Sequence, residues 1–153
     1  MVATVQSILR QYGALPFLIT EAGELKVLLV TSRGRRDWVI PKGWPIRGLS
    51  AAETAEREAY EEAGLVGTIV GDEPFGVYRH KKQGKSRKAT LCEVTVFLFA
   101  VERQRHKWPE KSQRETRWFA LKEASLLVAA AGLSELLSSA TPRSFVEQLA
   151  AAD

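Results

Sequence analysis

Three glutamates, Glu58, Glu61 and Glu62, have the type and spacing that most directly suggest chemistry in this sequence. A helix would place all three carboxylates along one side, because residues three and four apart are neighbours on a helix surface. Like charges at this spacing repel by roughly 0.2–0.5 kcal/mol per pair. A hard divalent cation such as Mg²⁺ relieves this repulsion and takes carboxylate oxygens as ligands. The pattern favours a metal site, and an acidic, solvated helix face is the alternative.

The residues around these glutamates predict the helix that must carry them. Ser50-Ala51-Ala52-Glu53 is a capping-box pattern, in which Ser50 is the N-cap and Glu53 reaches back to it. Gly64 tolerates the left-handed conformation that ends many helices. A narrow face able to pack closely on a sheet is formed by Ala52, Ala55, Ala59 and Ala63. We therefore expect a helix from about residue 51 to 63, with the acids beside its alanine face.

Strand patterns lie on both sides of this helix. The predicted strands are residues 25–31, residues 37–41 ending at Pro41, residues 65–79, residues 89–102 and a strand closed by Arg117-Trp118-Phe119. The basic run around Gly84 would be the hairpin loop between the third and fourth of these. Weaker helices are expected at about 121–130 and 142–151. Because strands and helices are interleaved, the sequence predicts an α/β layered fold.

Length and composition exclude several classes of protein. The chain has 153 residues, of which 45% are hydrophobic and 26% charged, which predicts one globular domain over residues 1–153 rather than disorder or fibrous repeats. Cys92 is the only cysteine, beside only two histidines, so an internal disulfide and structural zinc are not expected. Neither a signal-peptide layout nor a membrane-length apolar run is present. These features predict a cytoplasmic protein with no membrane partner, in which Cys92 is buried.

The basic residues are clustered. The net charge of +4 is modest and does not by itself indicate a nucleic-acid partner. Of the 22 basic residues, however, five lie in residues 33–47 and six in residues 79–88. The two segments are either solvated loops or part of a surface that binds a polyanion.

The segment from Gly43 to Leu65 resembles the Nudix box. Gly43 is followed after thirteen residues by Arg57-Glu58, after two more by Glu61-Glu62, and after one more by Gly64 and Leu65. This resemblance implies a Nudix fold, a mixed β-sheet sandwiched between helices (α/β/α), and metal-dependent hydrolysis of a diphosphate bond. The chain departs from the family pattern at Leu49, where the family has a glutamate. Arg57 would then pair with Glu53 or Glu61.

The resemblance also implies roles for individual residues. The implied ligands of Mg²⁺ or Mn²⁺ are Glu58, Glu61, Glu62 and a main-chain carbonyl at Lys42 or Gly43. The implied catalytic residues are Arg57, Glu58 and Glu61. One of the box glutamates, or an acid from a later loop, either Glu110 or Glu115, would act as the general base.

Residues outside the box resemble diphosphoinositol polyphosphate phosphohydrolases. These are the stretch from Thr31 to Trp44, Lys107-Trp108-Pro109-Glu110 and Arg117-Trp118-Phe119. Dinucleoside polyphosphate hydrolases share parts of this pattern. In such a fold the basic segments would bind phosphates, and the expected contacts are Arg33, Arg35, Lys42 and Arg87. Trp38, Trp44 and Trp118 would either stack on a base or belong to the core.

Three functions therefore stay open at this stage. The first is a pyrophosphohydrolase acting on a diphosphoinositol polyphosphate or a dinucleoside polyphosphate. The second is a pyrophosphatase acting on ADP-ribose, a nucleotide sugar or a triphosphate, and a capped or triphosphorylated RNA end is chemically a related substrate. The third is a polyanion-binding regulatory module in which the change at Leu49 has weakened catalysis.

Overall fold

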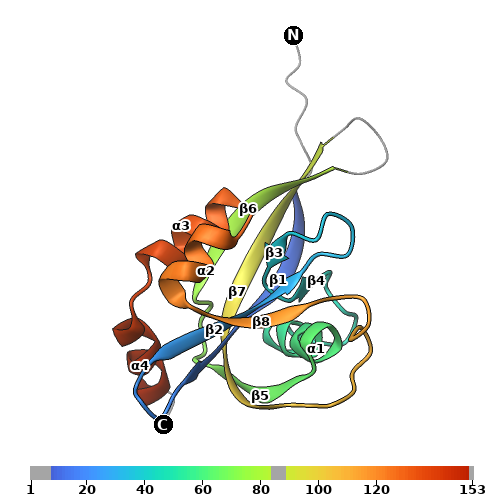
Figure 1. Cartoon of the computed structure of the whole chain (residues 1–153). Helices are drawn as coiled ribbons and strands as arrows, with labels where there is room; N and C mark the ends of the chain where they lie inside the picture. Colours follow the sequence, from blue (N-terminus) through green and yellow to red (C-terminus); the bar gives the residue numbers. More distant parts are fainter. Residues whose placement is uncertain (1–7, 84–88, 152–153) are drawn as a thin grey trace.

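The computed structural model describes residues 8–83 and 89–151. Within these ranges eight strands form one mixed sheet, and four helices lie against it (Figure 1). The strands are β1 (Ile8–Ile19), β2 (Leu25–Thr31), β3 (Trp38–Val39), β4 (Lys42–Gly43), β5 (Leu65–Val70), β6 (Gly76–Gln83), β7 (Ala89–Gln104) and β8 (Thr116–Ala120). The helices are α1 (Ala51–Ala63), α2 (Leu121–Leu127), α3 (Ala131–Ser139) and α4 (Pro142–Ala151).

The sheet is organised around the two longest strands, β1 and β7. They pair in parallel from Ile8 opposite Leu91 to Phe17 opposite Ala100, whereas every other pairing between two of the named strands is antiparallel. The 16 residues of β7 are long enough for its first part to pair with β6 and its last part with β5. On the other side, β1 pairs with β2 and with the short β4. The expected mixed sheet is therefore present.

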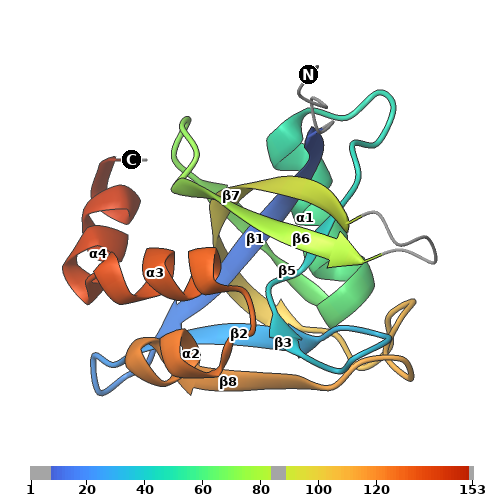
Figure 2. The same ribbon diagram turned by 90° about the horizontal axis from the view of Figure 1, so that it is seen from above.

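The helices form two layers, one on each face of the sheet, and a hydrophobic core lies between the sheet and each layer. The alanine face of α1 packs on one face of the sheet, where Ala55, Ala59 and Ala63 are fully buried. On the other face, Leu133 and Leu137 of α3 and Phe145 of α4 are buried in the larger core. Figure 2 shows α2, α3 and α4 grouped away from α1. None of the helices in the described ranges is both long and apolar enough to cross a membrane.

The local signals around α1 are confirmed. Ser50 Oγ accepts a hydrogen bond from the Glu53 backbone N–H at 3.1 Å, and Glu53 Oε1 accepts from the Ser50 N–H at 2.9 Å. Gly64 ends the helix with φ of 69°, in the left-handed region. The expected strands at β2 and β8 and the buried Cys92 are also found.

Other expectations about the elements were wrong or incomplete. The single strand expected over residues 65–79 is two strands, because the chain turns at Gly71, with φ of 85°, between β5 and β6. Strand β1 and helix α3 were not predicted at all. The β6–β7 hairpin is present, and its tip, residues 84–88, lies outside the described residues.

Candidate functional site

The carboxyl groups of Glu58 and Glu62 meet on the side of α1 that lies next to β4. Glu62 is 3% exposed, and its carboxyl group lies next to that of Glu58. Burial raises the pKa of Glu62 to about 8, with Arg114 opposing the shift and Glu58 adding to it. Burial also raises the pKa of Glu58, and the charges of Glu61 and Glu110 contribute to this shift. Four acids are thus close enough to affect one another, which is the electrostatic arrangement that a bound cation relieves.

Strand β4 lies directly against the carboxyl groups of Glu58 and Glu62. Its pairing with β1 places Lys42 opposite Gly13 and Gly43 opposite Tyr12. The Lys42 backbone N–H donates to Glu62 Oε2 at 3.0 Å. A Cβ atom at Gly43 would overlap the Glu58 carboxyl group, so a larger residue here would displace that carboxyl group from its place beside β4. Burial lowers the pKa of the Lys42 side chain, while the Glu62 carboxylate acts in the opposite direction.

A distant segment, residues 104–110, caps the C-terminal end of α1. The last carbonyls of a helix have no partner within it and need one from elsewhere. Here the four bonds run from Glu110 N to Glu61 O (3.0 Å), Trp108 Nε1 to Glu62 O (3.2 Å), Gln104 Nε2 to Ala63 O (2.9 Å) and Arg105 N to Gly64 O (2.8 Å). The cap fixes Glu110 beside the helix turn that carries Glu61 and Glu62.

Arg114 is the main residue of this site that sequence reasoning missed. Its guanidinium contacts Glu110 Oε1 through Nε at 3.0 Å and Glu62 Oε1 through Nη2 at 3.4 Å. Its Nη1 donates to the Thr31 carbonyl at 3.0 Å. The available signal was the four-residue spacing between Arg114 and Glu110, the last residue of the Trp108-Pro109-Glu110 stretch.

The donor set of the site fits a divalent metal such as Mg²⁺. Glu58, Glu61, Glu62 and Glu110 offer hard carboxylate oxygens, the ligands that Mg²⁺ prefers. Within residues 8–83 and 89–151, no three His, Cys, Asp or Glu side chains converge on one point closely enough to hold an ion. Both oxygens of Glu62 already accept contacts, from Lys42 and Arg114. Binding an ion would therefore require the carboxylates to reorient.

Comparison with known proteins decides the family. The model of the NUDIX domain matches residues 9–139, most of the chain. The chain belongs to the Nudix family. Nudix hydrolase 13, mitochondrial, of Arabidopsis thaliana is 37% identical over 106 residues, which are 66% of this chain and 52% of that protein. Nudix hydrolase 12, mitochondrial, of the same plant is 33% identical over 127 residues, 73% of this chain and 62% of that protein.

A solved structure supports the fold assignment. The crystal structure of C. elegans Ap4A hydrolase superposes with a TM-score of 0.63 at 20% identity, covering 92% of this chain and 99% of that one. At this identity the likeness concerns the fold alone. The chain spans only about half to three-fifths of the length of the two plant relatives.

The two candidate later acids of the Nudix site are placed differently. Glu110 lies beside the box acids, and its side chain is 18% exposed. Glu115 instead pairs with Arg117 at 2.8 Å, and its side chain is 46% exposed. The structure therefore brings Glu110, and not Glu115, to the box glutamates.

The expected pairing of Arg57 is not found. Among the described residues, Arg57 has no carboxylate within 4.0 Å; Glu53 is engaged in the capping box, and Glu61 is not paired with it. Arg57 is exposed and lines a hollow of about 370 Å³ on the outer side of α1, together with Leu49 and Tyr60. None of the box glutamates lines this hollow. Within the carboxylate cluster, the counter-charge expected from Arg57 comes from Arg114.

Substituting Leu49 with glutamate tests the departure from the Nudix box. Leu49 is only partly buried and belongs to neither core, so the new carboxylate would face the hollow shared with Arg57. We expect the free energy of unfolding to change by no more than about 1 kcal/mol, as for an exposed ion pair. Mg²⁺ affinity and turnover should change little, because none of the box glutamates lines this hollow. Thermal melting and Mg²⁺ titration of activity measure the two effects, and strong destabilisation would show that Leu49 is needed for packing.

Only some of the basic residues predicted to bind phosphate lie close to the carboxylate cluster. Arg33 reaches toward Glu110, with Nε 3.9 Å from Oε1, and donates to Gln113 Oε1 at 3.3 Å. Arg35 instead faces Asp37 at 3.8 Å and is 84% exposed. Lys42 lies in the site through β4, whereas Arg87 lies outside the described residues.

The tryptophans divide between core and surface. Trp38 packs edge-on against Phe119, and Trp118 packs against the core beneath α1. Trp44 is 42% exposed, and the Lys82 Nζ lies 5.1 Å from the centre of its ring. Of the three, Trp44 is the one placed to contact a ligand.

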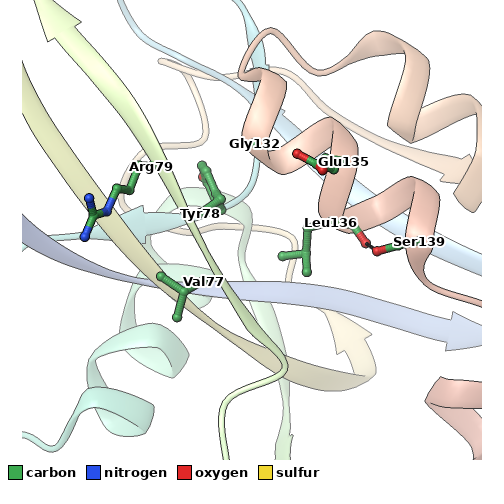
Figure 3. A pocket seen from close by; sticks show the side chains of 7 residues that line it. All are labelled: Val77, Tyr78, Arg79, Gly132, Glu135, Leu136 and Ser139. Carbon is green, nitrogen blue, oxygen red and sulfur yellow. Dashed lines mark hydrogen bonds between the residues drawn. The ribbon is translucent and has the colours of Figure 1, made fainter.

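A larger hollow of about 560 Å³ lies between β6 and α3 (Figure 3). Its lining residues are Val77, Tyr78, Arg79, Gly132, Glu135, Leu136 and Ser139. Arg79 is already paired with Glu93 at 3.0 Å, and none of the box glutamates lines the hollow. Size alone therefore does not mark the chemical site of this protein.

Proposed function

We propose that this Nudix chain is a metal-dependent pyrophosphohydrolase that cleaves a diphosphate bond in a highly phosphorylated small molecule, either a diphosphoinositol polyphosphate or a dinucleoside polyphosphate. The observation that carries the proposal is the gathering of Glu58, Glu61, Glu62 and Glu110 at one end of α1, where their charges affect one another and Glu110 is hydrogen-bonded to the helix through its backbone. A helix surface without a ligand gains nothing from such repulsion. The names of the plant relatives, both Nudix hydrolases, are consistent with the proposal.

Mg²⁺ or Mn²⁺, when bound, would neutralise phosphate oxygens and acidify a water molecule. The carboxylates of Glu58, Glu61 and Glu62 would hold the ion, with a main-chain carbonyl of β4 beside them. Glu110 approaches the same space from the later loop and is the better placed candidate for the general base, since Glu115 is turned toward Arg117. Lys42 and Arg33 would orient the phosphates of the substrate, as cations near a phosphoryl group do.

The preference for a phosphate-rich substrate is supported by the cations beside the acids. Burial lowers the pKa of Lys42, and the nearby charge of Lys82 acts in the same direction. Lys82 in turn lies over Trp44, and Arg33 lies on the Glu110 side. A chain of phosphates could therefore meet cations on both sides of the carboxylates. ADP-ribose, with only two phosphates, would use fewer of these contacts.

A phosphate-release screen with Mg²⁺ tests the proposed function. Inositol pyrophosphates, dinucleoside polyphosphates, ADP-ribose and nucleoside triphosphates would be compared at equal concentration. We expect the first two classes to give the highest kcat/KM. Comparable failure on all substrates, combined with tight binding of one of them, would instead support the polyanion-binding module.

Replacing Arg33 with glutamine tests the preference for many phosphates. At low salt we expect a loss of kcat/KM of about fivefold for a dinucleoside polyphosphate, the size of one exposed charge contact, and less for ADP-ribose. The loss should shrink at higher salt, because exposed charges are screened. Arg35→Gln is the matched control, since this neighbouring arginine faces Asp37. Equal losses for both substrates would mean that Arg33 only attracts anions generally.

The cytoplasmic location expected from the sequence stays a prediction. The two plant relatives carry the word mitochondrial in their names, which describes those proteins. Fractionation of cells that produce the chain would test the location directly.

A further inference from the structure

The guanidinium of Arg114 joins three segments that are far apart in the sequence. Each of its nitrogens has a different acceptor: the Thr31 carbonyl at the end of β2, Glu62 Oε1 on α1 and Glu110 Oε1 in the later loop. The side chain is only 10% exposed, and that of Glu62 is 3% exposed. A planar fork with several fixed donors can serve three acceptors at once, whereas a lysine ammonium is a single point of charge.

The backbone on both sides of Arg114 is held by other bonds. Glu115 exchanges two hydrogen bonds with Thr31, from its N–H to Thr31 Oγ1 at 2.9 Å and from the Thr31 N–H to its carbonyl at 3.0 Å. Glu110 N and Trp108 Nε1 are bonded to carbonyls of α1. Loss of the Arg114 side chain would therefore leave the loop in place and release mainly the carboxyl groups of Glu62 and Glu110.

We propose that Arg114 is a positioning residue that holds the Glu110 carboxylate beside Glu62, and that it thereby increases the affinity of the carboxylate cluster for a divalent metal. The inference deepens the proposed metal-dependent function and rests on it. Residues that hydrogen-bond to metal ligands fix the orientation of those ligands, and their loss typically weakens metal binding. Arg114 would act in this way on Glu62, one of the proposed ligands, and on Glu110, whose negative charge it holds beside Glu62.

The sign of the effect separates this role from simple electrostatics. Arg114 is a cation beside the acids, so removing its charge alone should make the cluster more negative and tighten the binding of a metal ion. Removing a positioning residue should instead weaken binding, because the carboxylates lose their mutual arrangement. Arg33 is the natural comparison, since its Nε lies 3.9 Å from the same Glu110 oxygen and its side chain is 63% exposed.

The test is a titration with Mn²⁺ alone, in which free Mn²⁺ is followed by electron paramagnetic resonance at constant ionic strength. The variants are Arg114→Gln, Arg114→Lys, Arg33→Gln as the charge control and Glu62→Gln as the site control. Melting of each metal-free protein shows whether it is folded. We expect Arg114→Gln to raise the Kd for Mn²⁺ by about 10- to 100-fold, Arg114→Lys to raise it less, and Arg33→Gln to leave it unchanged or lower it.

A double variant connects the effect to Glu110. In a Glu110→Gln background, adding Arg114→Gln should raise the Kd for Mn²⁺ by a much smaller factor than it does in the wild type. The reason is that one of the two acids that Arg114 positions is already gone. A Kd for Arg114→Gln equal to or below that of the wild type would overturn the proposal. If Arg114→Gln does not fold, an unchanged Kd for Arg114→Lys would overturn it equally. If the wild type does not bind Mn²⁺, or if Glu62→Gln leaves its Kd for Mn²⁺ unchanged, the proposed function itself would be overturned.

Discussion

Replacing Glu62 with glutamine is expected to lower kcat by about 10²–10³-fold, the loss of several kcal/mol of metal-assisted stabilisation, while the fold is retained. The amide keeps the shape of the side chain and can still accept the hydrogen bond from the Lys42 N–H. It removes one of the charges that would hold the metal. It also removes the acid that is most deeply buried beside Glu58. Thermal stability without metal should therefore equal or slightly exceed that of the wild type.

Glu56→Gln is the matched control for this experiment. It makes the same chemical change on the same helix, but Glu56 is exposed and lines the hollow on the outer side of α1. The control should keep the kcat and Mg²⁺ dependence of the wild type. Steady-state kinetics over a range of Mg²⁺ concentrations measure both variants. Turnover like that of the wild type for Glu62→Gln at saturating Mg²⁺ would exclude Glu62 as a metal ligand.

The helix that carries the acids could be predicted because its signals are local. The capping box at Ser50 and Glu53, the buried alanines and the left-handed Gly64 all act within one or two turns, so the sequence contains the whole cause of the helix. The position of the three box glutamates follows directly from it.

The elements that were missed depend on distant partners. Strand β1 contains Pro16 and has no alternating pattern, because it is largely buried between β2 and β7. Its parallel partner β7 begins about 80 residues later, which no local pattern reveals. Residues 65–79 were predicted as one strand because they are rich in Val, Thr, Phe and Tyr. The turn pattern Gly71-Asp72-Glu73-Pro74 within them is the local signal that divides the segment.

The site was predicted only in part, because some of its contacts also depend on residues that are distant in the sequence. The box acids share one helix, but Arg114 contacts groups from β2, α1 and the later loop, and only the fold brings these together. Arg57 shows the opposite case. Its spacing from Glu53 and Glu61 suggested an ion pair, yet Glu53 is used by the helix cap and Arg57 faces the outer hollow. Spacing on a helix limits which side chains can meet, and competition among partners decides which do.

The stability of the metal-free protein is expected to fall as the pH rises from about 5 to 8. The pKa of Glu62 is raised from 4.5 to about 8 in the folded state by burial, with the Arg114 charge opposing the shift and Glu58 adding to it. Between these values the folded state retains a proton that the unfolded state has lost, so raising the pH favours unfolding. The contribution is fully present below pH 4.5 and is lost as the pH passes 8. Its upper bound is about 5 kcal/mol.

Saturating Mg²⁺ should reverse this pH dependence, because metal binding requires ionised carboxylates and stabilises only the folded state. The rise in melting temperature on adding Mg²⁺ should therefore grow from pH 6 to pH 8. Glu62→Gln separates the contribution of Glu62 to stability from that of His80. Burial lowers the pKa of His80, so at lower pH its titration makes the folded state more stable as the pH rises, the opposite of the effect of Glu62. In this variant both the fall in stability and the Mg²⁺ response should be much smaller. A melting temperature of the metal-free wild type that rises steadily over this range would show that Glu62 is already ionised in the folded protein.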